Sequence, residues 1–225
     1  MRAFLKHNGL SIFFLGLFVA AVCLQALAGH ADFNEQQDFH GDPHISLARY
    51  VVSSEFGVAV MENWQSEYLQ FTLFIVLTVW LLQRGSPESK ELEKGGGVES
   101  DKDQMVGEHA TKDSPRWARV DGLRRRIYEN SLVLVMATFW IGTWFAQSVT
   151  GRVEYNATRL DHQLDPVSWG EYVTRPDFWE RTLQNWQSEF LAVGSMAILA
   201  VYLRQRGSPE SKPVGAPHHA TGVEG

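Results

Sequence analysis

The sequence predicts an all-α integral membrane protein: a four-helix bundle made of two tandem, parallel two-span repeats, with short interfacial helices in the outer loops. Two observations predict this fold. First, the apolar residues of the 225-residue chain gather in four runs, which strongly polar segments separate. Second, the two halves of the chain match each other at a constant offset of 122 residues, without a gap, from about residue 8 to about residue 90.

The internal repeat is clearest in two motifs. Residues 63–69, Asn-Trp-Gln-Ser-Glu-Tyr-Leu, return as 185–191 with Phe in place of Tyr. Residues 83–90, Gln-Arg-Gly-Ser-Pro-Glu-Ser-Lys, return unchanged as 205–212. One register held over such a length indicates a duplicated unit. The chain then divides into a first transmembrane repeat (1–90), a flexible cytoplasmic linker with a basic juxtamembrane end (91–122), a second repeat (123–212) and a disordered cytoplasmic tail (213–225).

Each repeat is expected to cross the membrane twice, in spans over residues 10–28, 63–82, 131–149 and 183–203. A helix needs about 20 residues at 1.5 Å each to cross a hydrocarbon layer of roughly 30 Å. The apolar run 68–82 has only 15 residues, so its helix is expected to begin near Asn63, at the outer edge of the bilayer. Gly85 and Pro87 are expected to end it, Gly as a left-handed cap and Pro as a stop.

The first apolar run has an alternative interpretation. Arg2 and Lys6 precede it, and the small residues of Ala-Leu-Ala at 26–28 end it, which is the pattern of a cleaved secretory signal peptide. The repeat argues against cleavage, because the equivalent run at 131–149 lies in the middle of the chain. We interpret residues 10–28 as a retained transmembrane helix.

Short helices are expected in the two outer loops. Asp42 and Pro43 are expected to begin one that runs to Tyr50, because Pro suits a first helical turn. Ser54 or a residue next to it is expected to cap the next helix. An Arg-Pro-Asp sequence at 175–177 is expected to open the last one.

The distribution of basic residues predicts the orientation. The N-terminal end, the 83–129 segment and the C-terminal tail hold 15 of the 20 Lys and Arg residues. Because basic residues are retained on the cytoplasmic side, both termini and the linker are expected in the cytoplasm. The expected location is the inner (plasma) membrane of a bacterium, with several spans.

A polar cluster is expected where the spans meet the outer loops. Asn63, Ser66 and Glu67 fall on one face of a helix, at spacings of three and four residues. A carboxylate in lipid is costly, so these side chains should face one another inside the bundle. The candidate cluster consists of Gln25, Asn63, Gln65, Ser66, Glu67, Gln147, Asn185, Gln187, Ser188 and Glu189. It is either a site for a proton or cation around Glu67 and Glu189, or a structural clasp that fixes helix packing, and we favour the clasp.

Aromatic and basic residues are expected at the two membrane surfaces. Trp residues gather near the ends of the spans, as in an aromatic belt, and Arg residues lie on the cytoplasmic side. The expected anchors are Trp64, Trp186, Arg84, Arg206, Arg124, Arg125 and Arg126. The last three are expected to contact anionic lipid head groups.

Bulk composition excludes several partners. A net charge of −6 provides no basic face for nucleic acid. The single cysteine, Cys23, supplies neither a disulfide framework nor a cysteine-based metal site. His40, Asp42 and His44 could approach a metal, but the second repeat does not keep their spacing, so no metal and no cofactor are expected. The expected partner is the lipid bilayer, with a homo-oligomer left open.

Three stretches resemble an uncharacterised family of bacterial four-span membrane proteins with the same tandem motifs. They are Asn-Gly-Leu-Ser at 8–11, the second Asn-Trp-Gln-Ser-Glu motif at 185–191, and Gln-Arg-Gly-Ser-Pro-Glu-Ser-Lys-Pro at 205–213. The resemblance covers nearly the whole chain apart from the linker. It implies a membrane location and this architecture, and it carries over no catalytic residue.

The sequence therefore favours a non-enzymatic structural or interaction protein, since no catalytic motif is visible. The alternative is a small ion, proton or solute transporter or channel that uses Glu67 and Glu189. Helix termination accounts for the Arg-Gly-Ser-Pro part of the motif at 83–90. It does not account for the Glu-Ser-Lys that follows, which suggests a specific contact at the cytoplasmic face.

Overall fold

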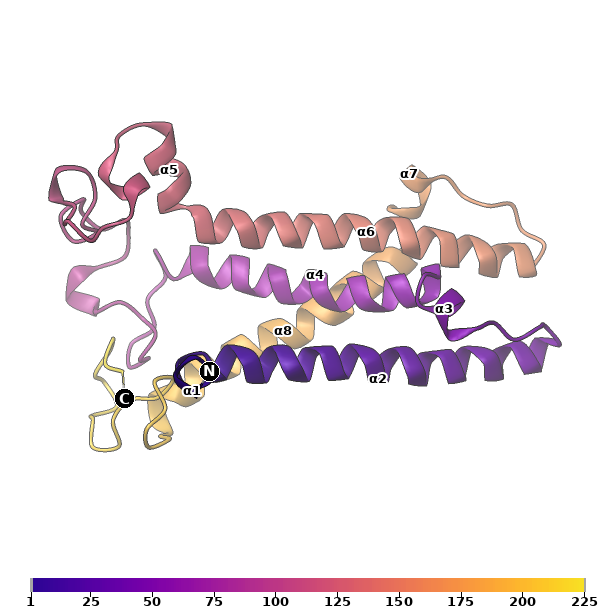
Figure 1. The fold of residues 1–225 in the computed structure, drawn as a ribbon, viewed down its shortest axis with the longest axis horizontal. Helices are drawn as coiled ribbons and strands as arrows, with labels where there is room; N and C mark the ends of the chain where they lie inside the picture. The colour runs from indigo at the N-terminus through magenta and orange to yellow at the C-terminus, as the bar shows by residue number, and fades with distance from the viewer. Residues whose placement is uncertain (1, 225) are drawn as a thin grey trace. The chain divides into compact units, whose positions relative to one another are not determined.

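The computed structural model describes residues 2–224, and within them it forms helices and turns but no strand (Figure 1). The predicted all-helical class is therefore confirmed. The α-helices are α1 (Arg2–His7), α2 (Gly9–His40), α3 (Leu47–Tyr50), α4 (Ser54–Leu77), α5 (Leu123–Glu129), α6 (Ser131–Asp161), α7 (Trp169–Tyr172) and α8 (Pro176–Tyr202). Three short 3-10 helices lie between α4 and α5: η1 (Leu92–Lys94), η2 (Gly107–His109) and η3 (Arg116–Arg119).

The chain divides into two compact units. The first consists of Met1–Met61 and Ala146–Tyr172, and the second of Glu62–Phe145 and Val173–Gly225. Each unit contains corresponding parts of both halves of the sequence. The first holds the loops that follow α2 and α6, and the second holds both copies of the Gln-Arg-Gly-Ser-Pro-Glu-Ser-Lys motif.

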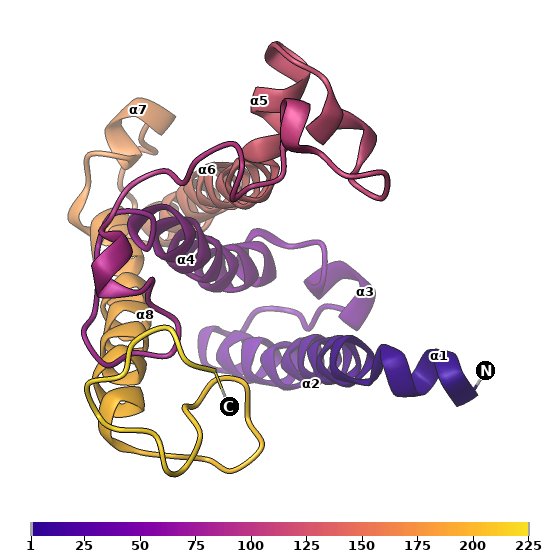
Figure 2. The same ribbon diagram turned by 90° about the vertical axis from the view of Figure 1, so that its left-hand side faces the viewer.

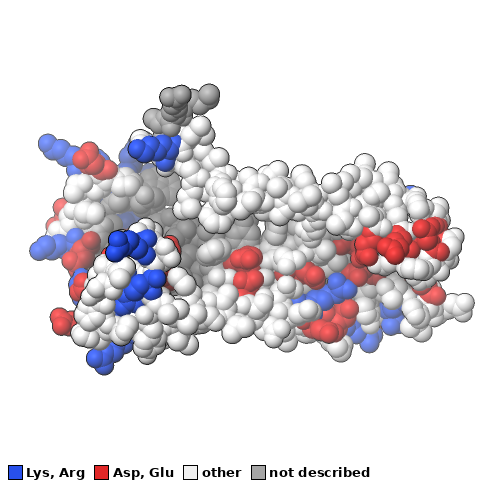
Figure 3. All heavy atoms as spheres, turned by 90° about the horizontal axis from the view of Figure 1, so that it is seen from below, with Lys and Arg blue, Asp and Glu red and all other residues white. Residues whose placement is uncertain are grey.

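Two helices, α2 and α6, are long and apolar enough to cross a membrane. Residues 9–31 of α2 carry no Lys, Arg, Asp or Glu, and this stretch is free of blue and red atoms in Figure 3. Ala26 is its one buried residue. A helix that exposes apolar side chains on all its faces is expected to be covered by lipid or by other helices. The described residues thus give two helices of this kind and not the predicted four; α4 and α8 each contain the polar Asn-Trp-Gln-Ser-Glu motif, which lowers their hydropathy.

Helix α4 ends earlier than the sequence predicts. The expected span reached residue 82, but the helix stops at Leu77 and the chain continues in turns. Beyond the helix, the carbonyl of Val79 accepts the N–H of Gly97 from the linker at 2.8 Å, in place of the helical bond that a longer α4 would make. Gly85 does adopt the left-handed conformation expected of it, with φ of 85°, but it lies in a loop beyond the helix.

Helices α2 and α6 extend further than their apolar runs. The expected loops began at residues 29 and 151, whereas the helices continue to His40 and Asp161. Gly41, with φ of 75°, caps α2 by donating its N–H to Asp38. The short helix expected from Asp42 begins only at Leu47, because the Ser46 side chain, not Pro43, provides its cap.

The starts of the two other long helices follow the sequence closely. Pro176 occupies the first turn of α8, as predicted. Ser53, next to Ser54, caps α4 as expected, since its hydroxyl accepts the N–H of Phe56 at 3.3 Å.

Side chains of the linker and the tail form ion pairs and hydrogen bonds within the chain. Arg125 pairs with Asp101, Asp121 and Glu129, so an expected lipid anchor is largely neutralised by carboxylates of the chain. The neighbouring Arg124 and Arg126 remain exposed. In the tail, which the sequence predicts to be disordered, the carbonyl groups of residues 217, 218 and 220 accept hydrogen bonds from the Lys212 ammonium.

Candidate functional site

The centre of the candidate cluster is a hydrogen bond between α4 and α8. Gln65 has 0% of its surface exposed. Its Nε2 donates to the carbonyl of Glu62 at 3.1 Å, and its Oε1 accepts the indole N–H of Trp186 at 2.8 Å. Every type of polar atom on this side chain therefore has a partner, which is what burial of an amide requires.

A second contact joins the same two helices one residue further along α4. The buried Ser66 hydroxyl donates to the carbonyl of Asn63 at 2.8 Å and lies 3.4 Å from Oε1 of Glu189. Glu67 lies close enough to Glu189 for the two carboxylates to repel each other when both are charged. The arrangement brings together four of the ten predicted cluster residues: Gln65, Ser66, Glu67 and Glu189.

The other polar residues of α4 and α8 in the predicted cluster serve their own helices. Asn185 donates to the carbonyl of Arg181 at 2.9 Å, and Ser188 donates to that of Asn185 at 2.8 Å. Asn63, Gln187 and Ser188 are exposed.

Gln25 and Gln147 belong to the first unit and differ in environment, although they occupy equivalent positions of the repeat. Gln25 is exposed, whereas Gln147 has 1% of its surface exposed. Neither polar atom of the Gln147 amide has a hydrogen-bond partner among the described residues. A buried amide without a partner costs about 1–3 kcal/mol.

The tryptophans of the second unit pack on one another instead of standing apart. The ring of Trp144 lies 5.8 Å from that of Trp186, 5.9 Å from that of Phe178 and 6.0 Å from that of Trp179. Trp144 also donates its indole N–H to Thr182, which is fully buried. Trp186, expected as an interfacial anchor, is half-buried in this group, and Trp64 is half-buried as well.

In the first unit, two asparagines clamp the loops that follow α2 and α6. Asn34 donates to the carbonyl of Ile45 at 3.2 Å and accepts its N–H at 3.0 Å. Asn156 does the same with Val167, at 3.0 Å and 2.8 Å. Both residues of the second pair lie 122 positions after those of the first. The repeat pairs these two asparagines in the sequence, but it does not predict their hydrogen bonds to the loops.

A tyrosine covers a helical glycine in each of these loops. The Tyr50 hydroxyl lies where a Cβ on Gly29 would be, and the Tyr172 hydroxyl lies where one on Gly151 would be. Tyr172 has 1% of its surface exposed and Tyr50 has 5%. Glycine is therefore required at both positions for close approach and not for backbone conformation.

The two copies of Gln-Arg-Gly-Ser-Pro-Glu-Ser-Lys form the same hydrogen bonds. The Ser89 hydroxyl accepts the N–H of Gln83 at 3.0 Å, and the Ser211 hydroxyl accepts that of Gln205 at 2.9 Å. In each copy the seventh residue of the motif, a serine, thus binds the backbone of the first residue and closes the loop. This bond is a structural reason for the second serine of the motif. We call residues 83–90 and 205–212 the motif loops.

The lysine that ends each motif loop binds the chain that follows it. Lys90 donates to the carbonyl of Gly97 at 2.9 Å and pairs with Glu99 at 3.4 Å. Lys212 makes its shortest bond, 2.8 Å, to the carbonyl of His218. The tail also returns to the first motif loop, because the N–H of Gly85 donates to the Thr221 hydroxyl at 2.9 Å. These contacts give the Ser and Lys of the motif a physical role.

The glutamates of the two motif loops meet. The side chains of Glu88 and Glu210, both exposed, lie close enough to each other for the carboxyl groups to interact. Loss of hydration, then a hydrogen bond to Glu210, then the negative charge of Glu210 raise the pKa of Glu88 to about 7. The pair therefore takes up or releases a proton near neutral pH. The sequence analysis left these glutamates without a role.

A cavity of about 710 Å³ lies between α4 and α8 beside this pair. Leu73, Phe74 and Leu77 of α4 line it on one side, and Val193, Gly194 and Ala197 of α8 on the other. Figures 1 and 2 show these two helices beside each other. Gln83, Ser86, Glu88 and Ser89 of the first motif loop border its polar end.

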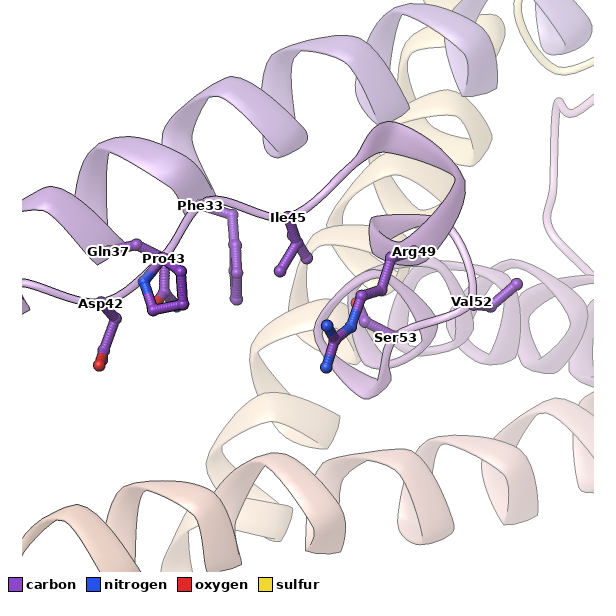
Figure 4. Close-up of a pocket in the computed structure, with 8 residues that line it drawn as sticks. All are labelled: Phe33, Gln37, Asp42, Pro43, Ile45, Arg49, Val52 and Ser53. Carbon is purple, nitrogen blue, oxygen red and sulfur yellow. The ribbon is translucent and has the colours of Figure 1, made fainter.

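The loop after α2 has a smaller cavity of its own, of about 550 Å³, which Figure 4 shows between α2 and α3. The Arg49 side chain extends into the space opposite Phe33. In the second half of the chain Arg159 replaces Gln37, and its Nε donates to the carbonyl of Asp165 at 2.7 Å. This bond closes the loop after α6, so the two halves differ here.

A comparison with known protein families gives one finding. The family model described as domain of unknown function (DUF6766) matches residues 1–223. No curated protein and no solved structure matches the chain.

Proposed function

We propose that this chain, which belongs to the DUF6766 family of domains of unknown function, is a four-span membrane protein with a structural or interaction role and no catalytic one. Its two hairpins, each a duplicate of the other, are fastened by a polar clasp. The clasp consists of Gln65, Ser66, Trp186 and Glu189. Hydrogen bonds of this kind fix helix pairs in a bilayer, where apolar contacts alone give little preference for one neighbour.

The main support for this proposal is that both polar atoms of the Gln65 side chain have a hydrogen-bond partner within the chain. A residue that binds an ion or reacts with a substrate needs a free polar group. The Gln65 amide oxygen is engaged by Trp186, and its nitrogen by Glu62 of the same helix. The buried part of the cluster on α4 is therefore occupied by bonds within the chain, as a clasp requires.

The length of the helices supports four spans. At 1.5 Å per residue, the 24 residues of α4 extend about 36 Å and the 27 residues of α8 about 40 Å. Both exceed the roughly 30 Å of a hydrocarbon layer. The N-terminal halves of both helices then occupy the periplasmic half of the layer. The motif loops lie at the cytoplasmic side, where most of the Lys and Arg residues of the chain are also expected.

Cysteine labelling tests this orientation. In a Cys23→Ala background, Asp42→Cys and Leu164→Cys place a thiol on the two expected outer loops, and Lys102→Cys and His219→Cys place one on the linker and the tail. All four positions are exposed. A membrane-impermeant maleimide is expected to label the first two in cells with a permeabilised outer membrane, and the last two only after lysis. Labelling of Lys102→Cys in unbroken inner membranes would refute the four-span topology.

A double-mutant cycle tests the clasp. Gln65→Met and Trp186→Phe each remove one end of the hydrogen bond, and the double variant removes both. We expect a coupling energy of about 0.5–1.5 kcal/mol from thermal unfolding in detergent micelles. Ser188→Ala is the control, since Ser188 bonds only within α8. A coupling energy of zero would show that the contact does not fasten the helices.

A transporter is the second candidate, and the proximity of Glu67 to Glu189 favours it. Two carboxylates that repel each other are stabilised by a proton or a cation between them. Under this hypothesis proteoliposomes containing the protein conduct protons or cations, and Glu67→Gln with Glu189→Gln abolishes the flux without unfolding the protein. Liposomes that show no flux above protein-free controls would remove this candidate.

A further inference from the structure

The cavity between α4 and α8 has two chemically distinct ends. Most of its wall is made of leucine, valine, alanine and phenylalanine side chains. Its volume of about 710 Å³ is within the range of 300–1,000 Å³ that holds small-molecule ligands. The polar end is bordered by Gln83, Ser86 and Glu88 of the first motif loop. A ligand that fits this space must combine a large apolar body with a polar group.

The charge at the polar end is negative. Glu88 is in contact with Glu210, and neither glutamate forms an ion pair with Lys or Arg in the part of the chain that the structure describes. The other charged residues of the motif loops are Arg84, Lys90, Arg206 and Lys212. The two lysines are engaged by backbone carbonyls and by Glu99, and Arg84 and Arg206 are exposed. The carboxyl pair is therefore the local charge that a ligand would meet.

Two aromatic rings add to the preference for a cation. Phe74 of α4 and Phe190 of α8 line the cavity from opposite sides. The face of an aromatic ring attracts a quaternary cation by about 0.5–2 kcal/mol. An anion would be repelled both by these rings and by the carboxyl pair.

We propose that this cavity binds a lipophilic monovalent cation, whose apolar groups lie between α4 and α8 and whose positive charge is neutralised by Glu88 and Glu210. A proton held at Glu88 leaves when the cation enters, so one positive charge replaces another. The proposal does not depend on the clasp at Gln65, and it stands if that clasp proves to be weak.

Gly194 provides a steric test of the same cavity. It lies in the middle of α8, and a Cβ added to it would meet no other atom within 4 Å. Replacing a glycine inside a helix also favours the helix. Gly194→Leu is therefore expected to fill the cavity without unfolding the protein. The equivalent position in the first repeat is Thr72, which is buried, so only one cavity of this kind is expected.

The experiment uses two probes of the same shape and opposite charge, tetraphenylphosphonium and tetraphenylborate, with the full-length protein in a non-ionic detergent. Equilibrium dialysis is expected to show saturable binding of the phosphonium and none of the borate. Glu88→Gln and Gly194→Leu should each weaken phosphonium binding at least tenfold. Glu91→Gln is the matched control, because Glu91 lies three residues from Glu88 and pairs with Lys94 outside the cavity.

The pH dependence gives an independent measurement. Because a proton must leave for the cation to bind, the affinity for the phosphonium should rise about tenfold from pH 6 to pH 8. The Glu88→Gln variant should show no such rise. Equal binding of the borate, or full binding by Gly194→Leu, would show that the probe partitions into micelles or elsewhere on the protein, and would overturn the proposal. Full affinity in Glu88→Gln would also overturn it.

Discussion

Asn156 holds Val167 through both ends of its side-chain amide, with Nδ2 donating to the Val167 carbonyl at 3.0 Å and Oδ1 accepting its N–H at 2.8 Å. A backbone clamped in this way loses both bonds at once when the amide is replaced. The clamp spans 11 residues, so it fixes the path of the loop between α6 and α7.

The first prediction concerns this clamp. Asn156→Leu should destabilise the protein by about 1–3 kcal/mol, because it leaves a half-buried N–H and carbonyl of Val167 without partners. Thermal unfolding in detergent, followed by circular dichroism, measures the effect. Asn34→Leu should behave alike, since Asn34 forms the same two bonds with Ile45. Thr158→Ala serves as the control, because Thr158 is exposed. A change of stability no larger than that of Thr158→Ala would contradict the prediction.

The second prediction concerns the glycines beneath the two loop tyrosines. Gly29→Ala should destabilise the protein, since the new methyl group would overlap the Tyr50 hydroxyl. Tyr50→Phe removes that hydroxyl oxygen, so the double variant Gly29→Ala/Tyr50→Phe should recover part of the lost stability. Overpacking of this kind costs about 1–3 kcal/mol. Gly16→Ala, whose Cβ would meet no atom within 4 Å, is the control in the same helix. No recovery in the double variant would show that the tyrosine is not the obstacle.

Part of this structure could be predicted from the sequence, and part of it could not. The constant offset of 122 residues predicted that the loops recur, and apolar runs with helix-start residues such as Pro176 located the long helices. The end of α4 at Leu77 could not be predicted, because the apolar run continues to Leu82 and the hydrogen bond of Val79 to Gly97 joins residues far apart in the chain. The meeting of Glu88 with Glu210 could not be predicted either, since the two residues are far apart in the chain and only the fold brings them together.

The third prediction is a pH dependence of stability that originates at Glu88. Its pKa in the folded protein is about 7, above its ordinary value of 4.5. The folded state therefore holds this proton more tightly than the unfolded state, and stability falls as the pH rises from 4.5 to 7 and is constant above. The loss should be on the order of 1 kcal/mol or less, because solvent screens a partly exposed pair.

This prediction is tested by comparing unfolding temperatures at pH 5 and pH 8. A stability change of 1 kcal/mol corresponds to about 2–4 °C for a chain of this size. Between pH 5 and pH 8 the unfolding temperature of the wild-type protein should fall by up to about 2–4 °C more than that of Glu88→Gln, because the glutamine side chain does not titrate. Glu91→Gln should follow the wild type. Identical pH profiles for the wild type and Glu88→Gln would show that the carboxyl pair does not titrate in this range.

The last prediction compares two buried glutamines, one with partners and one without. Gln147 has neither a donor nor an acceptor for its amide among the described residues, whereas Gln65 has both. Gln147→Met keeps the length of the side chain and removes the unpaired amide, so it should stabilise the protein by about 1–3 kcal/mol. Gln65→Met should destabilise it, because the Trp186 N–H loses its acceptor. Unfolding temperatures of the two variants are therefore expected to move in opposite directions. A lower unfolding temperature for Gln147→Met would mean that the amide is used in the membrane, by a water molecule or by a group of another chain.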